Sequence, residues 1–182
     1  MTDMFLKGGI LMWPILACSI TALAVILHKT MQYRIIMEQL NLSLKEIERQ
    51  RPPVLEPLIQ ALEKRLGDKE IGLIGTKQVR RLERGLGTLS LISVISPLLG
   101  LTGTVLGMIK AFQSMAEAGS RVEPAILATG IWEALITTAA GLLVAIAAHV
   151  AFHYLDSRMG EITLSMKEVT LALGSKTCQG DD

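Results

Sequence analysis

The sequence predicts an all-α integral membrane protein with three transmembrane helices and long cytoplasmic helical extensions. Half of the 182 residues are hydrophobic, only 19% are charged, and the mean hydropathy is +0.44. Lys, Arg, Asp and Glu are absent from residues 8–27 and 85–109, and residues 124–155 contain only Glu133. A helix of about 20 uncharged residues crosses the hydrocarbon core of a bilayer. This pattern argues against a soluble enzyme, and the net charge of +1 gives no support to a nucleic-acid partner.

The uncharged runs divide the chain into membrane and aqueous segments. Cytoplasmic segments carry an excess of Lys and Arg, and basic residues are scarce on one side only, at Lys7, Lys110 and Arg121. That side is therefore expected to be periplasmic. The segments are then a periplasmic N-terminus with the first transmembrane helix (1–28), a cytoplasmic helical region (29–84), a second transmembrane helix (85–112), a short periplasmic loop (113–124), a third transmembrane helix (125–155) and a cytoplasmic C-terminal tail (156–182).

The cytoplasmic region 29–84 has helical patterning of its own. The pair Pro52–Pro53 is expected to end a helix that runs unbroken out of the first span. A charged helix from Thr76 is expected to continue directly into the second span. Between these helices, apolar residues at helical spacing predict an amphipathic helix over Val54, Leu55, Leu58, Ile59, Leu62 and Leu66. Turns are expected at three glycines: Gly67, Gly72 and Gly75.

Few residues suit catalysis or metal binding. His149 and His153 lie four residues apart on one helix face, but a third metal ligand is not evident. An intramembrane protease would need a base near a serine nucleophile, and none is identifiable for the serines of the second span: Ser90, Ser93 and Ser96. We therefore expect no enzymatic activity, no metal and no cofactor.

Glu133 is the main candidate for function. An ionisable residue inside a span costs free energy and is by default a functional-site candidate. It could relay protons between the two aqueous sides, or it could be a structural carboxyl that is hydrogen-bonded to a neighbouring helix. At 100° per residue, Glu133 shares a face with Thr129 and Thr137. A second stripe consists of small residues, which let membrane helices approach closely: Ala134, Thr138, Gly141, Ala145 and Ala148.

The second span offers a matching surface. Gly103 and Gly107 form a close-packing pattern, with Gly100 and Thr104 on the neighbouring face. Because the two spans run in opposite directions, Thr104 and Glu133 are expected at similar depth. Three helices cannot enclose a channel, so the sequence implies a homo-oligomer with a ring of Glu133 carboxyls. A second protein could supply a further titratable group.

Two stretches resemble signatures of the MotA/TolQ/ExbB proton-channel family, most closely its ExbB and TolQ branch. Residues 96–108, Ser-Pro-Leu-Leu-Gly-Leu-Thr-Gly-Thr-Val-Leu-Gly-Met, are similar to the second-span signature of the family. Residues 130–142, which include Trp132-Glu133-Ala134-Leu135, are similar to the third-span signature. The start of the first span, Met12-Trp13-Pro14, also resembles the family.

The resemblance implies a bacterial inner-membrane stator that uses the proton-motive force to energise an outer-envelope process. It implies a pentamer around a dimer of a single-span partner of the ExbD or TolR type, which supplies an intramembrane Asp, and a further protein of the TonB or TolA type. Carried over by motif, Glu133 is the third-span glutamate, while Thr138 and Thr104 are pore threonines. Periodicity instead places Thr137 on the Glu133 face, so both threonines remain candidates.

The sequence departs from the family pattern at Thr102, where Leu is usual, and at Ala147, where Pro is frequent. The four-span MotA branch is disfavoured, because it is longer and lacks the glutamate. The alternative to a proton channel is a structural scaffold in which Glu133 only supports helix association. Which envelope process is served stays open at this stage.

Overall fold

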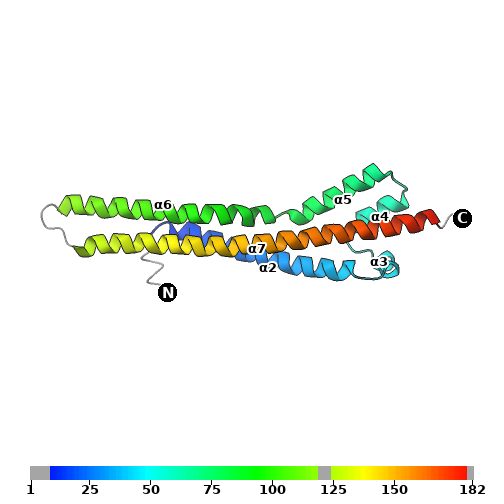
Figure 1. The fold of residues 1–182 in the computed structure, drawn as a ribbon, viewed down its shortest axis with the longest axis horizontal. Coiled ribbons are helices and arrows are strands. Elements are labelled where there is room, and N and C mark those ends of the chain that lie inside the picture. Colours follow the sequence, from blue (N-terminus) through cyan, green and yellow to red (C-terminus); the bar gives the residue numbers. More distant parts are fainter. Residues whose placement is uncertain (1–8, 119–123, 180–182) are drawn as a thin grey trace. The chain divides into compact units, whose positions relative to one another are not determined.

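The computed structural model describes residues 9–118 and 124–179, and these residues are mostly helical (Figure 1). Their elements in chain order are α2 (Met12–Leu40), α3 (Leu44–Gln50), α4 (Glu56–Glu63), α5 (Asp68–Glu83), α6 (Leu86–Ala118) and α7 (Pro124–Gln179). Three of them, α2, α6 and α7, are long and apolar enough to cross a membrane. The three expected helices are therefore present, one for each uncharged run.

Two of these helices extend beyond the expected span limits. α6 continues to Ala118, so the first part of the expected loop 113–124 is helical, and residues 119–123 lie outside the described residues. α7 begins at Pro124, a residue suited to a first helical turn because its missing N–H would have no helical partner there. α7 then continues to Gln179, so the expected tail 156–182 is helical as far as it is described.

The chain forms two compact units. The first contains the residues up to Ile26 together with Thr88–Phe152, which are mainly the apolar parts of α2, α6 and α7. Many of its large apolar side chains point outward; Leu101 is 58% and Leu143 70% exposed. Apolar patches of this kind are rare on water-facing surfaces, whereas they suit contact with lipid. This unit supplies the membrane part of a multi-pass protein.

The second unit contains Leu27–Gly87 and the residues from His153 onward. A buried stripe recurs along its part of α7 at intervals of three, four and seven residues, the period of a helix packed on one side. Its members are Leu155, Met159, Ile162, Met166 and Leu173. Further buried apolar residues come from the other helices of this unit: Ile36, Leu40, Ile47, Leu55, Leu58 and Ile59.

Two predictions about helix breaks in this unit are wrong. The turns expected at Gly72 and Gly75 do not form, because both residues lie inside α5, which begins at Asp68. A glycine inside a helix costs about 1 kcal/mol, and neither position requires one for packing: a Cβ at Gly75 would make an ordinary contact with Leu58 Cδ2 at 3.8 Å, and one at Gly72 would meet nothing within 4 Å. Both glycines are thus tolerated within α5. Gly67 does precede a helix, as the residue before Asp68.

The continuous helix expected from Thr76 into the second span is also interrupted. α5 ends at Glu83 and α6 begins at Leu86, because Gly85 adopts a φ of +101° that ends the helical path. The helix leaving the first span likewise ends earlier than expected, at Leu40, before α3 begins after Ser43. The break predicted at Pro52–Pro53 is present in addition.

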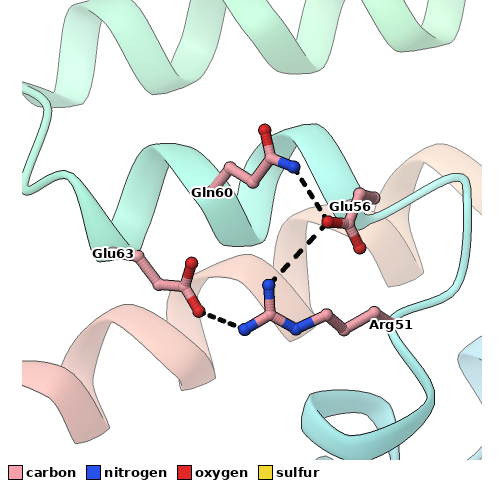
Figure 2. Close-up of polar contacts among 4 residues, drawn as sticks. All are labelled: Arg51, Glu56, Gln60 and Glu63. Carbon is pink, nitrogen blue, oxygen red and sulfur yellow. Dashed lines mark hydrogen bonds and ion pairs between the residues drawn. The ribbon is translucent and has the colours of Figure 1, made fainter.

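The corner between α3 and α4 is held by Arg51, which has a left-handed φ of 45°. Its guanidinium group lies 2.5 Å from a carboxylate oxygen of Glu63 and 3.8 Å from one of Glu56, while Gln60 donates a hydrogen bond to Glu56 (Figure 2). These side chains are partly or largely exposed to solvent. Surface ion pairs contribute about 0–1 kcal/mol each, so they orient the corner more than they stabilise the unit.

A buried polar cluster joins α2 to the end of α5. Lys29, only 5% exposed, donates from Nζ to the Leu82 carbonyl oxygen at 2.8 Å and to Gln32 at 3.0 Å. The Tyr33 hydroxyl donates to the same Leu82 oxygen at 3.0 Å. The last carbonyls of a helix lack helical partners, so this cluster satisfies one of them just before the break at Gly85.

Candidate functional site

The contact between α6 and α7 in the first unit is built on glycines. Gly100, Gly103 and Gly107 on α6 are all buried against α7. A Cβ atom at Gly103 would lie 2.8 Å from Thr137 Cβ, and one at Gly107 would lie 3.0 Å from Ala134 Cβ. A methyl group at Gly103 would clash with Thr137, and at Gly107 it would require Ala134 to shift, so the absence of side chains lets the two backbones come close together.

The same contact continues from the α7 side. A Cβ at Gly141 would lie 2.5 Å from the carbonyl oxygen of Ser96 and 3.2 Å from Gly100 Cα. Gly141 is thus the point where α7 lies directly on the α6 backbone. Ser96 is fully buried here, and its hydroxyl has no hydrogen-bond partner among the described residues. We call this contact, from Ser96 to Ala111 on α6 and from Gly130 to Gly141 on α7, the glycine seam.

Sequence reasoning missed one member of the glycine seam. A Cβ at Gly130 would lie 2.7 Å from Ala111 Cβ, at the opposite end of the seam from Gly141. Gly130 precedes Ala134 by four residues and therefore extends the small-residue stripe by one helical turn. The sequence signal is therefore present: the stripe of small residues begins at Gly130, one turn before Ala134.

The candidate threonines all donate their hydroxyl groups to backbone carbonyls. Thr138 bonds across the seam to Gly100 O at 2.8 Å, whereas Thr137 bonds within α7 to Glu133 O at 2.7 Å. Thr137 is 2% exposed and lies against Gly103. Thr104 bonds within α6 to Leu101 O at 2.6 Å and is half-buried. Within the protomer both α7 threonines therefore meet α6, and the role of each in a pore stays a prediction.

Glu133 lies beside the glycine seam, next to Ala134 in the sequence, and is half-buried. Its carboxyl group does not lie over a glycine of α6. It lies instead over Gly9, in the turn that precedes α2: a Cβ built at Gly9 would overlap the Oε1 atom of Glu133. The carboxyl is thus at a point where the turn before α2 meets α7 within the first unit. This contact joins residues that are far apart in the chain, and no sequence pattern pointed to it.

The described residues contain no group of three or more His, Cys, Asp or Glu side chains placed to hold a metal ion. The chemistry that the arrangement offers is that of one carboxyl group, which can take up and release a proton. The turn at Gly9 lies against this carboxyl, and the Thr137 hydroxyl bonds to the backbone oxygen of Glu133.

Comparison with known proteins gives consistent relatives. The MotA/TolQ/ExbB proton channel family matches residues 28–168. The chain is 30% identical over 203 residues to biopolymer transport protein exbB1 of Vibrio cholerae, covering 95% of this chain and 88% of that protein. It is 33% identical to the putative biopolymer transport protein ExbB-like 1 of Synechocystis sp., covering 85% and 70%. It is 35% identical to the Tol-Pal system protein TolQ of Haemophilus influenzae, covering 52% and 41%.

Proposed function

The chain belongs to the MotA/TolQ/ExbB proton channel family, within its ExbB and TolQ branch, and on that premise we propose that Glu133 carries the protons of an inner-membrane motor. The observation that carries this proposal is that Glu133 is the only Asp, Glu, Lys or Arg in residues 124–155. A carboxyl group makes insertion of a membrane helix less favourable. Its presence in such a helix therefore indicates a functional role.

The mechanism is a cycle of protonation. A neutral carboxyl can face a low-dielectric surface at much lower free-energy cost than a carboxylate. Uptake of a proton from one side and release to the other therefore couples the charge state of Glu133 to the surface it faces. Moving one charge through 100 mV yields about 2.3 kcal/mol, enough to bias such a step. In this proposal Thr104, Thr137 and Thr138 supply oxygen atoms along the path.

The working unit is a homo-oligomer, with five copies implied by the family resemblance. It surrounds a dimer of an ExbD- or TolR-type single-span protein, whose Asp exchanges protons with the ring of Glu133 carboxyls. A TonB- or TolA-type protein would pass the motion on to the outer envelope. The N-terminus is periplasmic and the C-terminus cytoplasmic, as the basic residues indicate; Lys7 and Arg121, on which this orientation partly depends, lie outside the described residues.

Proton flux into liposomes tests the proposal. The protein is reconstituted with its partner, and Glu133→Gln and Glu133→Ala are compared with Glu117→Gln, which removes an exposed carboxyl near the end of α6. Both Glu133 variants should reduce flux to the level of protein-free liposomes while the oligomer mass is unchanged, and the Glu117 variant should match the wild type.

The scaffold alternative makes the opposite prediction. If Glu133 served only helix association, Glu133→Gln would conduct and assemble like the wild type, because the amide keeps the size and hydrogen-bonding capacity of the carboxyl. Glu133→Leu would then break the oligomer. The contact of the Glu133 carboxyl with Gly9, in the turn before α2, is the observation that favours a structural role.

A further inference from the structure

The turn before α2 has a backbone conformation that favours glycine. Gly9 has a φ of +69°, and its carbonyl oxygen accepts a hydrogen bond from the Met12 N–H at 3.2 Å. Residues with a Cβ are disfavoured in this left-handed region, whereas glycine is not. The turn thereby leads directly into the first turn of α2.

Gly9 also lacks a side chain at the one place where the carboxyl of Glu133 needs the space. A Cβ on Gly9 would overlap Oε1 of Glu133, and would lie 3.3 Å from Cδ and 3.9 Å from Cγ. The carboxyl end of the Glu133 side chain therefore packs against the backbone of Gly9. Conformation and contact are two separate reasons for glycine at this position.

The backbone of Glu133 is held in place, whereas the end of its side chain can rotate. Its own helix is held on α6 by the glycine seam, in which Ala134 lies on Gly107 and Thr137 lies on Gly103. The Thr137 hydroxyl bonds to the backbone oxygen of Glu133. A methyl group at Gly9 must therefore be accommodated by rotation of the Glu133 side chain or by displacement of the turn.

We propose that Gly9 is a positioning residue, which holds the carboxyl of Glu133 in one place by leaving room for it and covering one of its oxygen atoms. The inference rests on the proposed function only in giving this carboxyl a role in proton transfer. In the proton cycle the carboxyl would have to leave the Gly9 turn to reach a partner group, so the turn defines one end point of its movement.

The test is the reactivity of Glu133 in the full-length protein in membranes towards dicyclohexylcarbodiimide, a membrane-soluble reagent for carboxyl groups. In Gly9→Ala the carboxyl is pushed off the turn and loses its cover. Labelling at position 133, followed by mass spectrometry of the peptide, should become about two- to tenfold faster, the factor that corresponds to an unfavourable side-chain rotamer. Gly87→Ala is the matched control, because a Cβ there meets nothing within 4 Å.

A second pair of variants separates positioning from simple backbone strain. Glu133→Asp shortens the side chain by one methylene and withdraws the carboxyl from Gly9. Adding Gly9→Ala to Glu133→Asp should then leave the labelling rate unchanged. Thermal stability should fall only by the cost of placing alanine at the positive φ of position 9. Gly9→Asn tolerates positive φ better than Ala but retains the Cβ, so it should accelerate labelling of Glu133 as Gly9→Ala does.

Two results would overturn the inference. One is a labelling rate in Gly9→Ala equal to that of the wild type. The other is an equal effect of Gly9→Ala with Glu133 and with Glu133→Asp, including failure to fold in both. Folding rescued by Glu133→Asp would support it. A Glu133→Ala protein that conducts normally would defeat the proposed function and leave this labelling result standing, so the two failures are distinguishable.

Discussion

The glycine seam of the first unit and the polar cluster of the second hold helices together in different ways. In the seam, backbone lies on backbone, and a Cβ at Gly141 would come within 2.5 Å of the Ser96 carbonyl oxygen. In the second unit, Lys29 and Tyr33 reach the Leu82 carbonyl oxygen through long side chains. Lipid gives apolar helices no hydrophobic reason to associate, so close fit has to supply the attraction in the seam.

The second unit also has an open groove beside α4, α5 and α7, with a volume of about 1200 Å³, lined by apolar residues such as Leu58 and Met166 with Arg65 and Lys167 among its charged residues. Its buried apolar stripes stabilise this unit without contact between backbones. The glycine seam depends on backbone contact instead. We therefore expect shape changes to damage the seam most, and loss of buried polar contacts to damage the second unit most.

The largest effect is expected from Gly141→Ala. The new methyl group meets the backbone of α6 rather than a flexible side chain, so the helices must separate along the seam. Overpacking costs about 1–3 kcal/mol, and contact with backbone places Gly141→Ala at the upper end, so the melting temperature of the purified protein should fall strongly.

Gly160→Ala on the same helix is the matched control. A Cβ at Gly160 meets nothing within 4 Å, and alanine is the better helix former by about 1 kcal/mol. This variant should be as stable as the wild type or slightly more stable. Equal destabilisation by the two variants would mean that close approach in the seam is not what stabilises α6 on α7.

An intermediate effect is expected from Lys29→Met. Methionine fills a similar volume but removes the ammonium donor, so that of the two groups that donate to the Leu82 oxygen, Tyr33 is left. Hydrogen bonds from charged groups contribute about 1.5–3 kcal/mol when buried, so the melting temperature should fall clearly. Lys45→Met removes an exposed lysine and is the control. Indistinguishable melting of the two variants would rule out a stabilising role for the cluster.

The sequence predicted the parts of the fold that depend on composition and periodicity. Absence of charge located the three long helices, and small residues at helical spacing located most of the glycine seam. It did not distinguish Gly72 and Gly75, which lie inside a helix, from Gly85, which ends one. All three share the same local preference, so residue type alone does not tell a glycine inside a helix from one that ends it.

The candidate site was predictable to the same extent. Glu133 is evident because one charge in an apolar run is conspicuous, whereas its contact with Gly9 joins positions separated by most of the chain. For the threonines, a 100° repeat favours Thr137 and a motif favours Thr138. The structure gives each threonine a distinct contact: Thr137 bonds to the backbone oxygen of Glu133, and Thr138 bonds to Gly100 across the seam. Neither feature identifies which of the two side chains would face a pore.

The smallest effect is expected from Thr138→Val, which deletes the hydrogen bond across the seam and nearly preserves the shape of the side chain. Such bonds between membrane helices contribute on average about 0.6 kcal/mol, so the melting temperature should fall only slightly. Thr102→Val, which removes an exposed hydroxyl bonded within α6, is the control. If Thr138→Val cost as much stability as Gly141→Ala, the seam would depend on its hydrogen bond, and the contrast with the Lys29 cluster would disappear. A small cost for Thr138→Val beside a large one for Gly141→Ala would instead identify close fit as the main source of stability in the seam.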